Sequence, residues 1–196
     1  MTTTVPRPTA TMSADEFLVW AETQDDDYEL VDGRAVAMSR DRKGHNVTKG
    51  FVFSALAAAI KRDKHPCTPY SDGIGVKTPA DAVRRPDASV ECGEPFDPAG
   101  LFLAKPVIVV EVVSPSSERD DTIAKFADYF SIPSIAHYLI VLPDRRMVIH
   151  HARSGASADG PTVLSAIRQT GELRLDPPGL VLAVEELFAS ELEAGT

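Results

Sequence analysis

Apolar residues occur along this chain in two kinds of block, some recurring at helical spacing and others running without interruption. In residues 44–62, the side chains of Val47, Phe51 and Ala58 recur one or two helical turns apart, which predicts an amphipathic helix. The apolar positions in residues 117–131 have the same spacing and predict a second helix. These two helices are the longest elements that the pattern indicates.

The strongest uninterrupted block covers residues 107–113, where β-branched residues surround a single acid, Glu111, between Pro106 and Pro115. Such a block is typical of a strand buried on both faces. An ionised carboxylate inside it is costly unless it is paired, hydrogen-bonded or bound to a metal. Asp87 opens another apolar segment directly after a proline. We therefore take Asp87 as the candidate partner of Glu111.

Shorter apolar blocks and their flanking residues predict the remaining elements. Ser13, with Glu16 three positions later, has the form of a capping box at the start of a helix. A hairpin is expected around the turn residues at 32–33, and residues 114–117 are expected to form a turn and helix cap. We expect further strands near 68–70, 74–77, 86–91, 137–142, 147–151, 162–168 and 172–175, and a short helix at 184–189.

The order of these elements favours an α/β (α+β) fold. The helix at 117–131 lies between two strands, which predicts a parallel crossover. We expect a central mixed β-sheet flanked by this helix and the helix at 44–62. The chain contains no visible repeat or linker, so residues 12–190 are expected to form a single domain between flexible tails at 1–11 and 191–196.

Composition narrows the partners of this domain. The chain has 196 residues, is 43% hydrophobic and 25% charged, and has no apolar run long enough to span a membrane. Its net charge of −9 argues against a broad nucleic-acid-binding face. Contact with nucleic acid would therefore depend on a few basic side chains, for which Lys43, Lys49, Arg84 and Arg85 are the candidates.

The two cysteines bear on the compartment. Cys67 and Cys92 are not in a CxxC or zinc-like spacing, and two cysteines are compatible with a reducing environment. Cys92 is expected to be a small buried hydrophobic residue. We therefore expect a cytoplasmic protein.

Five strings in a fixed order carry a resemblance that covers about residues 13 to 190. They are YELVDG at 28–33, GHN at 44–46, RPDASVECGEP at 85–95, VEVVSPS at 110–116 and KFADYFSIPSIAHYLIV at 125–141. Together they resemble the bacterial Uma-type (Uma-two) restriction endonucleases of the PD-(D/E)XK superfamily. The resemblance implies a restriction-endonuclease-like core, a divalent metal site and a nucleic-acid substrate, with DNA favoured over RNA. Relatives of this fold often act as homodimers, so the resemblance also allows a homodimer here. The sequence itself leaves the oligomeric state open.

The chemistry of a magnesium or manganese site explains why two acids are expected together. Mg²⁺ prefers oxygen ligands and usually takes one or two carboxylates together with waters and phosphate oxygens. Asp87 and Glu111 would supply this pair. The superfamily's usual lysine position is occupied here by Val113. The resemblance points instead to Lys125 as the catalytic lysine, and to Glu29 as a further acidic residue of the site.

Each of these residues also has a simpler interpretation. Glu111 could be neutralised by an internal cation, and Lys125 could form a surface pair with Asp121. Glu29 could belong to turn chemistry, and His45 could form only local hydrogen bonds. Three interpretations of function therefore stay open: a metal-dependent phosphodiesterase, a catalytically weak or inactive module that binds nucleic acid or protein, and a structural protein whose buried acids are paired internally.

Overall fold

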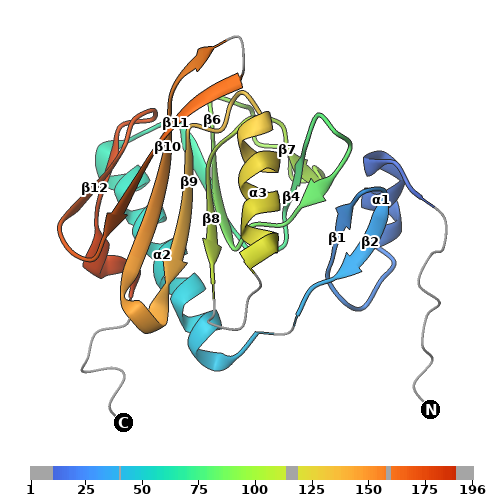
Figure 1. Ribbon diagram of the computed structural model, residues 1–196, viewed down its shortest axis with the longest axis horizontal. Coiled ribbons are helices and arrows are strands. Elements are labelled where there is room, and N and C mark those ends of the chain that lie inside the picture. The colour runs from blue at the N-terminus through green and yellow to red at the C-terminus, as the bar shows by residue number, and fades with distance from the viewer. Residues whose placement is uncertain (1–10, 40, 114–118, 158–159, 189–196) are drawn as a thin grey trace.

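Figure 1 shows the computed structural model, which describes residues 11–39, 41–113, 119–157 and 160–188. The predicted tail at 191–196, the predicted turn and cap at 114–117, and all but one residue of the predicted tail at 1–11 lie outside these ranges. The α-helices of the described residues are α1 (Ala14–Ala21), α2 (Lys43–Asp63) and α3 (Arg119–Ser131). The α1 helix begins with the predicted capping box, in which Ser13 and Glu16 hydrogen-bond to each other's backbone.

A six-stranded mixed sheet forms the centre of the fold, which confirms the predicted architecture. The β8 and β9 strands are parallel and are joined through α3, as predicted, while the other neighbours in this sheet are antiparallel. In spatial order the strands are β11 (Gly160–Arg168), β10 (Met147–Ser157), β9 (His137–Leu142), β8 (Pro106–Val112), β6 (Ala88–Cys92) and β3 (Cys67–Ser71).

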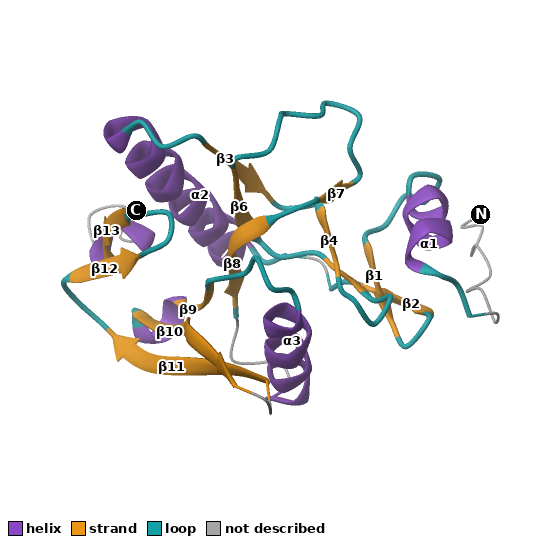
Figure 2. Cartoon of the chain, turned by 90° about the horizontal axis from the view of Figure 1, so that it is seen from above, coloured by secondary structure: helices purple, strands orange, loops and turns teal. Residues whose placement is uncertain are grey.

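The two long helices cover opposite faces of this sheet (Figure 2). On one face, Leu56 of α2 belongs to the same buried cluster as Val110 of β8. On the other face, Tyr129 of α3 belongs to a cluster that contains Val109. Because successive side chains of a strand point to opposite faces, Glu111 is directed to the same side as Val109, toward α3.

A smaller five-stranded sheet lies beside α1 and was not predicted as a separate sheet. Its β5 and β7 strands have two residues each, which is too short for a hydrophobic period to be visible in sequence. The predicted hairpin is present, and Asp32 and Gly33 both have positive φ, as a type I′ turn requires. The strands in order are β2 (Arg34–Ala37), β1 (Tyr28–Val31), β5 (Val83–Arg84), β4 (Gly75–Lys77) and β7 (Phe102–Leu103).

The C-terminal part packs against α2 as a β-ribbon of β12 (Glu172–Leu175) and β13 (Leu180–Ala183). Two 3₁₀ turns complete the described elements, η1 (Pro143–Arg145) and η2 (Val184–Leu187). The predicted helix at 184–189 is therefore a single 3₁₀ turn in the described residues. The β13 strand was not predicted from the sequence. None of the described helices is long and apolar enough to cross a membrane.

The cysteines correct one prediction. Cys67 and Cys92 form a disulfide, with their Cα atoms 4.0 Å apart, instead of two reduced thiols. They face each other because they are paired residues of the antiparallel β3–β6 ladder. Their spacing in sequence carried no sign of this pairing, since it depends on how two strands align. The cytoplasmic location stays a prediction.

Candidate active site

The fold brings Asp87 and Glu111 to the same end of two neighbouring strands. Ala88 of β6 is paired with Val110 of β8, so the residue before Ala88 and the residue after Val110 are next in the antiparallel register. Both acids are buried, with 5% and 7% of their surface exposed. Asp87 is close enough for its negative charge to raise the pKa of Glu111.

Glu111 is held by two side chains of α3. Lys125 donates a hydrogen bond from Nζ to Oε2 over 3.1 Å, and the Tyr129 hydroxyl donates to Oε1 over 2.6 Å. Burial raises the pKa of Glu111 to about 7, with further raising from the negative charges of Asp87 and Glu29, although Lys125 opposes the shift. This carboxylate is therefore easily protonated and lies among other acids.

Glu29 reaches the same cluster from β1 of the small sheet. Its Oε1 lies 3.2 Å from Lys125 Nζ and accepts the backbone N–H of Arg85, and its Oε2 accepts from Arg84 over 3.0 Å. Arg84 also donates to Asp128 of α3 over 2.7 Å. The interpretation of Glu29 as turn chemistry is wrong, because its carboxylate is buried among cationic side chains.

The surface alternative for Lys125 is also wrong. The residue has only 8% of its surface exposed, and its ammonium lies between the carboxylates of Glu111 and Glu29. This arrangement agrees with the simpler interpretation of Glu111, in which an internal cation neutralises its carboxylate. It also places a lysine beside Glu111, one of the two proposed metal ligands.

Asp87 is surrounded by groups from the start of α2 and from β8. Its Oδ1 lies 2.7 Å from Lys49 Nζ, and its Oδ2 accepts the backbone N–H of Val112 over 2.6 Å. His45 Nε2 lies 4.0 Å from Asp87 Oδ2 and also contacts the carbonyl oxygen of Val112, while His45 Nδ1 lies 2.7 Å from Asp41. Burial raises the pKa of Asp87, although the positive charge of Lys49 opposes this shift.

Three residues of this cluster were not predicted from the sequence to belong to the site. Lys49 and Arg84 were expected to contact nucleic acid, but both are buried in ion pairs, at 8% and 2% exposure. Tyr129 was not predicted to belong to the site, but its hydroxyl donates to Glu111. A usable signal existed in each helix, because Lys49 lies four residues after His45, and Tyr129 lies four residues after Lys125.

The donor set of the site suits a hard cation. Asp87 and Glu111 offer carboxylate oxygens from neighbouring strands, and the backbone N–H of Val112 donates to Asp87. The described residues contain no group of three or more His, Cys, Asp or Glu side chains arranged to hold a metal. A magnesium ion here would therefore depend on two carboxylates, with waters or phosphate oxygens completing its shell.

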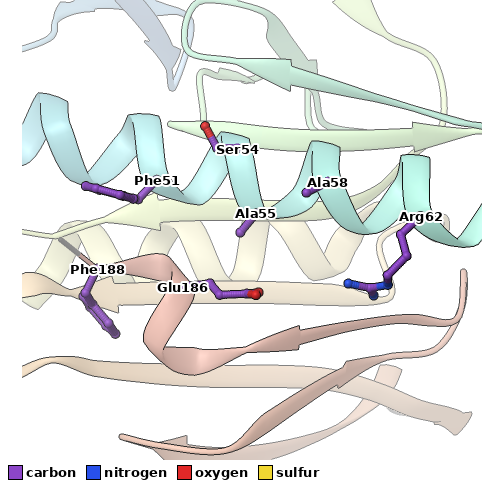
Figure 3. Close-up of a pocket in the computed structure, with 7 residues that line it drawn as sticks. All are labelled: Phe51, Ser54, Ala55, Ala58, Arg62, Glu186 and Phe188. Atoms are coloured by element: carbon purple, nitrogen blue, oxygen red, sulfur yellow. The ribbon is translucent and has the colours of Figure 1, made fainter. Parts of the chain in front are cut away.

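A groove along α2, shown in Figure 3, has none of the cluster residues in its lining. It lies between α2 and the segment around η2. None of the buried acids or lysines described above lines it. Its lining residues are Phe51, Ser54, Ala55, Ala58, Arg62, Glu186 and Phe188.

Comparison with solved structures defines the class of fold. The chain is similar to a crystal structure described as a "putative nuclease belonging to DUF820" from Anabaena variabilis, with a TM-score of 0.70 and 15% sequence identity. The similarity covers 90% of this chain and 97% of that chain. The protein thus has the same mixed α+β fold as that structure.

The sequence defines the family. Residues 14–185 match the Uma2 family, described as "Putative restriction endonuclease", and the chain belongs to this family. It is also 27% identical over 183 residues to "Uncharacterized protein slr1290" from Synechocystis sp., covering 92% of this chain and 93% of the relative. The family match confirms the resemblance seen in the five sequence strings.

Proposed function

We propose that the protein is a metal-dependent endonuclease that hydrolyses phosphodiester bonds of nucleic acid, with DNA favoured over RNA. One observation carries the proposal: two buried carboxylates, Asp87 and Glu111, lie at the ends of adjacent strands beside a buried lysine. Burial raises the pKa of Glu111, and the negative charges of Asp87 and Glu29 raise it further, so a cation bound there would relieve repulsion between the acids. Membership of the Uma2 family supports the same conclusion.

The residues of the cluster have distinct roles in this proposal. Asp87 and Glu111 would hold Mg²⁺ or Mn²⁺. When bound, such an ion neutralises phosphate charge and makes a bound water more acidic. Lys125 would stabilise the negative charge that develops on the phosphate. Glu29 holds the Lys125 ammonium in position and has its own oxygens occupied by Arg84 and Arg85.

A second candidate function is a binding module on the same fold without turnover. It is favoured by the net charge of −9 and by the fact that Asp87, Glu111 and Glu29 all have cationic partners within the protein. The two candidates share a fold and differ in whether the acids work as ligands. A cytoplasmic location and a homodimer belong to either candidate.

The test is cleavage of plasmid, single-stranded and branched DNA, and of RNA, at low salt with Mg²⁺ or Mn²⁺. Asp87→Asn and Glu111→Gln should each reduce cleavage by about a hundredfold or more, because each removes an ionised ligand near the reacting phosphate. Lys125→Ala should lose less cleavage activity, and the loss should be mainly in the cleavage rate. Glu172→Gln, on the exposed side of β12, is the matched control and should cut like wild type.

Two results would contradict catalysis. One is a wild-type protein that cuts none of these substrates with either metal. The other is a folded Glu111→Gln variant that cuts as well as wild type. In both cases the binding-module interpretation would replace the proposal, and nucleic-acid binding without cleavage would support it.

A further inference from the structure

Lys49 has an unusual set of partners for a buried lysine. Its Nζ lies 2.7 Å from Asp87 Oδ1, 2.8 Å from Asp41 Oδ2 and 2.7 Å from Asp72 Oδ2. An ammonium has three N–H donors, so three carboxylates can use all of them. The three acids come from the segment before α2, the turn after β3 and the residue before β6. A single side chain therefore joins three separate parts of the chain.

The three carboxylates differ in how deeply they lie. The side chain of Asp87 is 6% exposed, that of Asp41 is 25% exposed and that of Asp72 is 43% exposed. Lys49 thus has one inner acceptor and two outer acceptors. Burial acts to lower the pKa of Lys49, but the three negative charges outweigh it and raise that pKa above its usual value. The side chain therefore stays cationic wherever Asp87 is ionised.

We propose that Lys49 is an internal cation that occupies Asp87 when no divalent ion is bound, and that its ammonium withdraws onto Asp41 and Asp72 when the ion binds. This inference rests on the proposed function, because it assigns Asp87 to the metal. It adds that metal affinity is set by competition with a residue of α2. Lys49 is a positioning residue in this scheme, since it acts through Asp87.

Geometry makes the competition necessary. A divalent ion binds carboxylate oxygens at about 2.0 to 2.6 Å. An ammonium 2.7 Å from the same carboxylate would then lie close to the ion, and the two positive charges would repel each other. Lysine has a flexible four-carbon stem, and its two outer carboxylates can keep the ammonium after it leaves Asp87. Removing the ammonium should therefore strengthen metal binding, and removing an outer carboxylate should weaken it.

The first experiment measures binding of Mn²⁺ alone to the full chain by calorimetry. Lys49→Gln is expected to bind Mn²⁺ about tenfold more tightly than wild type, and Asp72→Asn about threefold more weakly. Asp63→Asn, near the distant end of α2, is the matched control for loss of one exposed acid and should bind like wild type. A folded Lys49→Gln variant that binds Mn²⁺ no more tightly than wild type would overturn the inference.

A double variant separates competition from simple attraction. If Asp72 acts by holding the displaced ammonium, Asp72→Asn should have no effect in the Lys49→Gln background. If Asp72 only attracts the ion through its charge, the loss of affinity will be equal in both backgrounds, and the inference is wrong. Asp87→Asn tests the proposed function separately from the competition. Unchanged Mn²⁺ binding in that variant would show that Asp87 is not a metal ligand.

A measurement on wild type covers the case in which Lys49→Gln does not fold. The ¹⁵N signal of a buried, fully hydrogen-bonded ammonium should be visible by NMR in the metal-free protein. Adding Mg²⁺ should shift this signal, and the shift should be absent in Asp87→Asn. A Lys49 signal that does not respond while Mg²⁺ binds would contradict the displacement.

Discussion

Glu111 shows how one buried acid depends on its neighbours. It lies in an apolar strand and accepts hydrogen bonds from Lys125 and Tyr129. Its pKa is still raised to about 7, because burial has the largest effect on that pKa. Its pKa is therefore higher in the folded protein than in the unfolded chain. The folded state holds this proton more tightly, so the associated stabilisation is complete below the unfolded pKa and is lost as pH rises through the folded pKa.

This sign gives a prediction for the metal-free protein. Glu111→Gln keeps the side chain neutral, so the variant should gain stability relative to wild type as pH rises from about 5 to about 8. Thermal unfolding at several pH values, with a chelator present, measures the difference. Glu172→Gln removes an exposed carboxyl and should show a constant difference over the same range. A constant difference for Glu111→Gln as well would mean that its pKa is close to that of an ordinary glutamate.

At the scale of elements, the β3–β6 pair depends on the Cys67–Cys92 disulfide at one end of its ladder. The cross-link joins residues 25 positions apart, and closing a loop of this size stabilises a protein by about 3 kcal/mol. The double variant Cys67→Ser/Cys92→Ser should lose about this much free energy of unfolding in urea. Reduced wild type should match the double variant, and equal stability of the oxidised and reduced forms would contradict the prediction.

The elements that could be predicted were those with a long or well-marked pattern. The helices at α2 and α3, the β8–α3–β9 crossover and the hairpin at Asp32–Gly33 all followed from local spacing or turn chemistry. The two-residue strands β5 and β7 could not be seen, because their pairing depends on distant segments.

The residues of the site also divide into those that the sequence indicated and those that it did not. Asp87, Glu111, Lys125 and Glu29 were proposed for the site from the sequence, and the structure buries all four of them. The position of Lys49 against Asp87 was not recognised, because Asp41, Asp72 and Asp87 meet only after three segments have folded together.

At the scale of the whole molecule, Glu29 connects the small sheet to the rest of the protein. It stands on β1 and pairs with Lys125 of α3 and with Arg84, which in turn pairs with Asp128 of α3. The domain expected at 12–190 thus depends on a buried charged network as well as on apolar packing. We expect the two sheets to lose stability together when this network is broken.

Glu29→Gln tests that expectation. Removing one partner of a buried ion pair leaves uncompensated charge, so the free energy of unfolding should fall by about 3 kcal/mol. Urea unfolding is the measurement. Lys77→Met removes the exposed Lys77–Asp15 pair of the same sheet and should cost at most about 1 kcal/mol. A Glu29→Gln variant as stable as Lys77→Met would show that the network contributes little.

The disulfide also has a practical consequence for work at the bench. The segment that it closes contains Asp72, Arg84 and Asp87, and two of these are contacts of Lys49. Reaction mixtures for nucleases often combine magnesium with dithiothreitol, a reagent that reduces disulfides. Preparations made with and without thiols are therefore different samples of this protein. Cleavage should be screened in both, and the number of free thiols should be counted in each batch.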